Sequence, residues 1–303
     1  MPLNGGQPGD KGFLTVISHG WMAKGKKPRH VFKNISQYSI EPEVWQPKAD
    51  LWPMIEEVII KSRSAGGKRV VQPLHGKESG EIFFKISPLS SIPSKVRATL
   101  AIKRRSGLYD WPLEELSNHA KAQKRTQLIP RLLGYGVIRQ RNGLVSAIFL
   151  NYEHLKGWDD AYSWLKTQAK QTHEFAKAGL ELILQLNRQN IYHLDLWAGN
   201  MMLNNNDISN LKAIDLENCF MGKNPHPSET LGFQFALLYQ HQLSEFISEP
   251  LYDQLVKSCL TKAEHIEKAR FNIFYEHFKH HGAGRKERHL IPKTGRLPQL
   301  TAC

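Results

Sequence analysis

Residues 191–219 read IYHLDLWAGNMMLNNNDISNLKAIDLENC, and the fold that we expect for this chain rests on them. Asp195 is followed five residues later by Asn200, and then by the apolar run MML, which predicts a short strand. A polar turn leads into a second apolar run, LKAI, which delivers Asp215 at its end. The pattern predicts a hairpin whose two ends present these three polar residues on one side.

The three side chains suit phosphoryl transfer. Asn200 and Asp215 offer oxygen ligands for a hard cation such as Mg²⁺, which keeps several waters and takes its other ligands from substrate phosphates. The separate carboxylate of Asp195 is then free to receive a hydroxyl proton. This chemistry needs metal ions that neutralise the phosphates and a group that orients or deprotonates the acceptor. The stretch therefore predicts a phosphoryl-transfer site.

The same residues carry a family resemblance. HLDLWAGN followed by IDLEN resembles the catalytic loop and the metal-binding motif of the protein-kinase-like fold, H-R-D-x-x-x-x-N and D-F-G. The matching residues are His193, Asp195, Asn200 and Asp215, and the departures are Leu194 for Arg, Leu216 for Phe and Glu217 for Gly. Within that fold, the H-x-D-L-x-x-x-N motif followed by I-D-[FL] without glycine is similar to the bacterial lipopolysaccharide core kinases, the Kdo/WaaP group.

The resemblance implies an α+β, bilobal protein-kinase-like fold with a small antiparallel-sheet N-lobe and a mainly helical C-lobe. A length of 303 residues can hold two moderate cores. We expect a basic N-terminal extension over residues 1–50, the N-lobe over 51–152, the C-lobe over 153–283 and a basic, mobile C-terminal tail over 284–303. Helical periodicity in residues 161–190 predicts a rigid support that runs into the catalytic loop.

In a kinase-like N-lobe, a strand lysine binds the α- and β-phosphates of ATP and a helix glutamate pairs with that lysine. The run ATLAIK reads as a strand ending in Lys103, and AIK resembles the V-A-I-K strand of the family. PLEELSNHAKAQKR predicts a helix, and the spacing to LIPRLLGYG favours Glu115 as the partner glutamate. An equal alternative is that Glu114 and Glu115 only favour the helix dipole.

A glycine-bearing turn is the candidate phosphate cover. Residues 69–73 and 81–86 predict two strands joined by LHGKESG. Gly76 and Gly80 in this segment are candidates to present backbone N–H groups to the nucleotide phosphates. The spacing departs from G-x-G-x-x-G, so an ordinary turn is an equal reading, and SAGG at residues 64–67 is an alternative loop.

The amino-acid composition indicates which kinds of partner the protein could bind. A net charge of +13 and a pI near 9.6 favour acidic partners, namely nucleic acid, anionic lipid or phosphorylated glycan, although charge also serves solubility. No apolar run approaches the roughly 20 residues that cross a bilayer, and MPLNGGQPGDKG does not resemble a secretory signal. Three widely spaced cysteines suggest neither a disulfide framework nor a zinc site. We expect a cytoplasmic protein.

The segment after Asp215 restricts the class of molecule that the kinase would phosphorylate. It has no A-P-E motif and no long activation segment, which protein kinases use to bind peptides. We therefore predict a kinase that uses ATP and Mg²⁺ to phosphorylate a Kdo or heptose hydroxyl of the lipopolysaccharide inner core. We expect the protein to bind this glycolipid and an anionic membrane surface, and not nucleic acid. We expect it to lie peripherally on the inner membrane. The alternatives are another small-molecule or protein acceptor, or a catalytically silent kinase-like scaffold with a basic binding surface.

Overall fold

The computed structural model describes residues 29–30, 38–40, 49–64, 68–77, 80–140, 142–204 and 206–297. They divide into two compact units. The first unit contains the described residues up to Leu116 together with Leu132–His154, and the second contains Ser117–Arg131 and the described residues from Leu155 on. The predicted N-terminal extension lies almost entirely outside the described residues.

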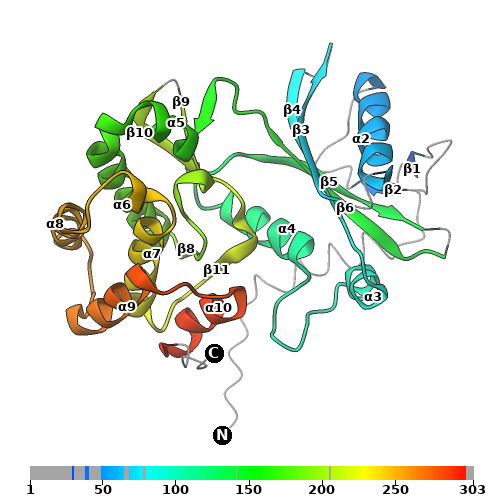
Figure 1. Cartoon of the computed structure of the whole chain (residues 1–303). Helices are drawn as coiled ribbons and strands as arrows, with labels where there is room; N and C mark the ends of the chain where they lie inside the picture. The colour runs from blue at the N-terminus through cyan, green and yellow to red at the C-terminus, as the bar shows by residue number, and fades with distance from the viewer. Residues whose placement is uncertain are drawn as a thin grey trace, which may run out of the picture. The chain divides into compact units, whose positions relative to one another are not determined.

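The first unit is built on a six-stranded antiparallel sheet (Figure 1). Its strands are β1 (Arg29–His30), β2 (Tyr38–Ile40), β3 (Val70–Gly76), β4 (Gly80–Pro88), β5 (Leu132–Arg139) and β6 (Val145–Glu153), in the order β1-β2-β5-β6-β4-β3. Its helices are η1 (Ala49–Leu51), α2 (Trp52–Ser64), α3 (Ile92–Leu100) and the first part of α4 (Trp111–Ala122). Pro73 lies in β3, at the sheet edge where a missing N–H is tolerated.

Apolar residues of α2 cover one face of this sheet. The core contains Leu51, Ile55, Val58 and Ile59 from the helical segment, and Phe84 and Phe149 from the adjacent strands β4 and β6. The rings of Phe84 and Phe149 are stacked with centroids 5.4 Å apart. The predicted strands around the glycine-bearing turn are confirmed as β3 and β4, which pair antiparallel.

One N-lobe prediction is wrong. The run ATLAIK is not a strand, because residues 92–100 form α3 and its tail follows a left-handed Ala101. The Ser91 side chain caps the helix by accepting a hydrogen bond from the Ser94 N–H at 3.3 Å, and a proline lies in the first turn. These start signals outweigh the β-branched residues that suggested a strand.

The second unit is mainly helical. Its helices are the rest of α4, α5 (Ala161–Thr167), η2 (Ala169–Gln171), α6 (Thr172–Arg188), η3 (Ala198–Asn200), η4 (Leu216–Asn218), α7 (Pro227–Gln240), η5 (Leu243–Glu245), α8 (Glu249–Leu260), α9 (Lys268–His280) and α10 (Arg285–Thr294). Its strands are β7 (Trp158–Asp160), β8 (Ile191–His193), β9 (Met201–Asn204), β10 (Asp207–Ala213) and β11 (Cys219–Met221), in the sheets β10-β9-β7 and β11-β8.

Close helix packing forms the core of the second unit. A Cβ on Gly232 of α7 would lie 2.4 Å from the Phe271 carbonyl oxygen of α9, so glycine lets these two helices approach directly. Phe233 of α7 packs edge-on against Phe278 of α9, with ring centroids 4.9 Å apart. The predicted helical stretch of residues 161–190 is divided into α5, η2 and α6, and the apolar side of α6 is buried. Its role as a support for the catalytic loop stays a prediction.

The predicted mobile tail is also wrong in part. Residues 285–294 form α10, and Ile291 within it is fully buried. Burial of an apolar side chain and capping of the helix by Glu287, which accepts from the Gly284 N–H at 2.6 Å, explain why this basic segment is ordered. Residues 298–303 lie outside the described part of the chain. Among the described residues, no helix is long and apolar enough to cross a bilayer.

Candidate functional site

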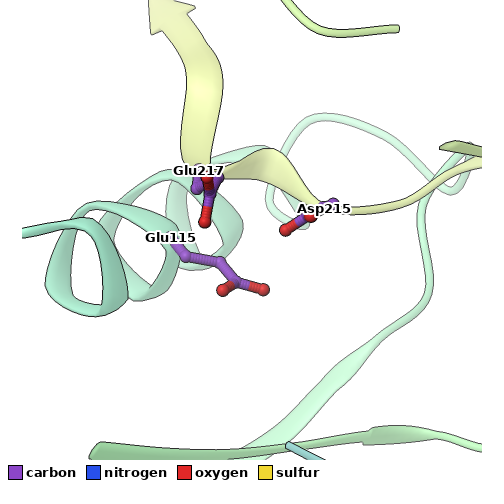
Figure 2. Close-up of side chains that lie close together, drawn as sticks. All are labelled: Glu115, Asp215 and Glu217. Carbon is purple, nitrogen blue, oxygen red and sulfur yellow. The ribbon is translucent and has the colours of Figure 1, made fainter. Parts of the chain in front are cut away.

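A buried ion pair marks the first unit. Lys85 of β4 places its Nζ 2.5 Å from Oε1 of Glu115 on α4, and the two side chains are 5% and 2% exposed. The Tyr152 hydroxyl donates to the same carboxylate oxygen at 2.9 Å. Figure 2 shows the Glu115 side chain projecting from α4. Because the charges are removed from water, each depends on the other for compensation.

The lysine predicted for this role is elsewhere. Lys103 lies on the exposed segment after α3, and its Nζ is 5.2 Å from the centre of the Tyr109 ring. Glu115 therefore pairs with Lys85 rather than with Lys103. The physical reason is that ATLAIK folds as a helix end, whereas the strand after the glycine-bearing turn carries Lys85.

The turn glycines lie where β3 meets β4. Gly76 and Gly80 face each other across the hairpin, and Gly80 has a φ of 72°, a conformation that favours glycine. Gly80 precedes Lys85 by five residues, which is roughly 16 Å along a strand at about 3.3 Å per residue. That separation argues against one phosphate group contacting both, so phosphate binding by these glycines stays a prediction. The alternative loop lies mostly outside the described residues.

The predicted catalytic hairpin forms in the second unit. Strands β9 and β10 pair antiparallel, with Leu211 opposite Leu203 and Ala213 opposite Met201. Asn200 ends η3 immediately before β9, and Asp215 comes two residues after β10. The hairpin thus delivers both proposed metal ligands from one supersecondary element.

Hydrogen bonds fix His193 between the two segments. Its Nδ1 accepts from the Asp195 N–H at 3.2 Å, and its Nε2 lies 2.9 Å from the Ile214 carbonyl oxygen. This pattern requires the proton on Nε2, because a carbonyl can only accept. Burial lowers the pKa of His193, which favours the same neutral ring. The histidine is a structural link between the catalytic loop and the residue before Asp215.

A second link joins Asn200 to both segments. Its side-chain Nδ2 donates to the Asp195 backbone carbonyl oxygen at 2.8 Å, and its backbone carbonyl oxygen accepts from the Ile214 N–H at 3.0 Å. Because Nδ2 is used as the donor, the amide oxygen is the atom that can bind a cation. Asp195, Asn200 and the residue before Asp215 are therefore held in one hydrogen-bonded frame.

The Asp195 carboxylate has two side-chain partners. Asn218 donates from Nδ2 to Oδ2 at 3.1 Å. Arg288 of α10 donates from Nη1 to Oδ1 and also lies 3.4 Å from the Leu194 carbonyl oxygen. Arg288 is itself held by its Nε, which donates to the Ala283 carbonyl oxygen at 2.9 Å. Both carboxylate oxygens are thus oriented by the surrounding chain.

Asp215 adopts an unusual backbone conformation. Its φ of 61° and ψ of 60° lie in the left-handed region, which costs a non-glycine residue energy and often marks functional sites. One carboxylate oxygen of Asp215 and one of Glu217 lie within 4.8 Å of each other, and Figure 2 shows these two side chains. The carboxylates of Asp215 and Glu217 and the amide oxygen of Asn200 are all oxygen donors, the kind of ligand that Mg²⁺ prefers.

Three residues escaped sequence reasoning. Lys85 had a usable signal, because it lies on an apolar strand directly after the glycine-bearing turn. Asn218 follows Asp215 by three residues, but an isolated asparagine is usually a turn residue. Arg288 lies 93 residues from Asp195, and only the docking of α10 brings the two together.

The chain was compared with known protein families, curated proteins and solved structures. No protein-family model and no curated protein matches this chain. Among solved structures, the chain is similar to WaaP in complex with acyl carrier protein, at 13% sequence identity and a TM-score of 0.46, covering 68% of this chain and 83% of that chain.

Proposed function

We propose that the protein is an ATP- and Mg²⁺-dependent kinase that phosphorylates a sugar hydroxyl of the lipopolysaccharide inner core. The single observation that carries the phosphoryl-transfer part is the hydrogen-bonded frame that holds Asp195 and Asn200 next to the segment of Asp215. In phosphoryl transfer the protein mainly positions the reactants and stabilises charge, so a pre-oriented carboxylate beside a cation-binding donor set is the required equipment.

Each group has a distinct task in this proposal. The Asp195 carboxylate orients the acceptor hydroxyl and takes its proton as the hydroxyl oxygen bonds to the γ-phosphorus of ATP and the bond to ADP breaks. Asn200 and Asp215 would hold Mg²⁺, which neutralises the phosphate oxygens when bound. Lys85 would bind the α- and β-phosphates, and Glu115 would hold Lys85 in place. Lys85 takes over the task that the sequence assigned to Lys103.

The acceptor class follows from the sequence resemblance and from charge. The motif pair resembles the Kdo/WaaP kinases, and the chain carries a net charge of +13. Phosphorylated core glycolipids are polyanions in a negatively charged leaflet, which a basic protein favours. Chain segment 222–226 leads from β11 directly to α7, so the described chain has no long activation segment after Asp215.

A catalytically silent scaffold is the second candidate. The observation that favours it is Arg288, which occupies Oδ1 of Asp195, the atom that would receive the acceptor proton. In that case the frame would be kept for its shape, and the basic surface would bind the partner.

Phosphate transfer separates the two candidates. The experiment incubates the protein with ATP labelled at the γ-phosphate, Mg²⁺ and core glycolipids of defined length. We expect label in the glycolipid with the wild type and a reduction by orders of magnitude with Asp195→Asn, which keeps the side-chain shape. Absence of label with every acceptor, or equal labelling by both proteins, would contradict the proposal. Label in another small molecule or in a protein would keep the kinase and change its acceptor.

A further inference from the structure

Helix α3, labelled in Figure 1, carries large apolar side chains that are exposed to solvent. Ile92, Val96 and Leu100 are 70%, 37% and 46% exposed, and Ile102 just beyond the helix is 49% exposed. The three helical residues are spaced by four, so they form a ridge about 12 Å long on one side of α3 at roughly 1.5 Å per residue. We call these four residues the apolar ridge.

The opposite side of α3 packs on the protein with small residues. Ser94 and Ala98 are the buried residues of the helix, at 6% and 1% exposure. The Thr99 hydroxyl accepts a hydrogen bond from the Val145 N–H at 2.9 Å, which ties the helix to the start of β6. An ordinary surface helix buries its large apolar residues and exposes its polar ones. Packing within the first unit therefore does not account for the apolar ridge.

Basic residues flank the ridge. Residues 91–110 contain five Lys and Arg residues and a single acidic residue, Asp110. Arg97 and Arg104 both pair with the buried Asp110 carboxylate, and the Arg97 Nε lies 2.9 Å from Oδ2. The other three cations, Lys95, Lys103 and Arg105, add their charge beside the ridge, and the last two are exposed.

We propose that the apolar ridge and its flanking cations form a docking surface for an anionic lipid bilayer. Apolar side chains on one side of a helix enter the headgroup–acyl boundary, while Lys and Arg beside them contact anionic headgroups. The ridge is a convex row along a helix, which suits insertion into a bilayer. The combination of aliphatic side chains with cations favours anionic lipid over nucleic acid, because nucleic acid contacts need no exposed aliphatic row.

The inference stands on exposure and charge in the first unit, and it deepens the membrane location in the proposed function without resting on phosphoryl transfer. Vesicle binding is measured without ATP, so loss of docking and loss of kinase activity are separate results. The ridge residues are exposed, so replacing them leaves the packed core intact, and a thermal melt of each variant checks this.

The test is co-sedimentation of the full chain with two kinds of vesicle, phosphatidylcholine alone and phosphatidylcholine mixed with phosphatidylglycerol. The ridge variant is Ile92→Ser with Leu100→Ser, and its matched control replaces exposed apolar residues of the second unit, Leu251→Ser with Ile273→Ser. The charge variant is Lys95→Glu with Arg105→Glu, and its matched control is Lys257→Glu with Lys268→Glu.

We expect the wild type and both controls to bind the anionic vesicles. Both the ridge variant and the charge variant should bind roughly tenfold or more weakly, as expected from losing two aliphatic insertions or reversing two charges. Undiminished binding by the ridge variant would overturn the proposal. So would equal wild-type binding to both vesicle types, or a wild-type dimer that the ridge substitutions dissociate without any vesicle binding.

Discussion

Lys85 and Glu115 make the sharpest residue-scale prediction. Lys85→Met leaves the Glu115 carboxylate buried without its cation, which should lower the free energy of unfolding by about 3–5 kcal/mol. Lys85→Met with Glu115→Leu should recover most of that loss, because neither charge is then buried. Urea denaturation measures both. The matched control is Lys103→Met, which should change stability by less than about 0.5 kcal/mol because Lys103 is exposed. Equal effects of Lys85→Met and Lys103→Met would contradict this assignment.

Arg288 makes a second prediction at the same scale. We infer that it positions the Asp195 carboxylate, so Arg288→Ala should lower kcat for phosphoryl transfer about tenfold or more, with the KM for ATP little changed. Arg270→Ala, an exposed arginine on α9, is the control and should leave both constants unchanged. A variant at Arg288 that is faster than wild type would show instead that the arginine obstructs the acceptor.

Sequence reasoning succeeds at this scale where spacing along the chain sets geometry. Asp195, Asn200 and Asp215 lie on one hairpin with its flanking turns, so local chain geometry brings their segments together. It fails where a partner is distant in sequence, because Arg288 and Asp195 meet only after α10 docks. The match of AIK to a kinase motif favours Lys103, whereas Ser91 and Pro93, upstream of that run, are helix start signals that argue against a strand there.

At the scale of elements, α10 shows why a basic terminus can be ordered. His289 of α10 is 3% exposed, and its Nε2 has no hydrogen-bond partner among the described residues. Burial, followed by the nearby cations Arg285, Lys293 and Arg288, lowers the pKa of His289 to about 4. A count of charges along the sequence predicts a mobile tail, because such a count does not show that one side of a short helix is buried.

This histidine gives the pH prediction. In the unfolded chain the pKa of His289 is near 6.5. As the pH falls below that value, the unfolded state binds a proton before the folded state does, so the free energy of unfolding decreases. Between pH 7 and pH 5 the loss from this residue should be about 2 kcal/mol. Urea denaturation at the two pH values should show a smaller loss for His289→Leu than for wild type. His173→Leu, at an exposed histidine, should keep the wild-type loss, and an unchanged loss in His289→Leu would contradict the prediction.

At the scale of the whole molecule, the sequence predicts the class of the fold better than its boundaries. The observed mixture of a six-stranded antiparallel sheet and a mainly helical unit agrees with the expected α+β class. The first unit ends at His154, and residues 117–131 belong to the second unit, while the lobe boundary predicted after residue 152 stays a prediction. Hydrophobic periodicity identifies helices and strands, whereas the unit that a segment joins depends on packing between residues far apart in sequence.

The net charge of the whole protein favours both a polyanionic acceptor and an anionic membrane surface. The net charge of +13 does not by itself distinguish a glycolipid from any other polyanion. The apolar ridge on α3 is proposed to bind a lipid surface, and the hydrogen-bonded frame around Asp195 is proposed to carry out phosphoryl transfer. Each is testable without the other.

A nucleotide site built on the hydrogen-bonded frame should reveal itself through binding of ATP and Mg²⁺. The measurement is the thermal stability of the wild type, Asp215→Ala and Lys103→Met with and without ATP and Mg²⁺, since a ligand that binds the folded state raises the melting temperature. We predict a rise for the wild type and for Lys103→Met, dependent on Mg²⁺ and absent in Asp215→Ala. No rise in the wild type, or the same rise in Asp215→Ala, would contradict a nucleotide site built on this frame.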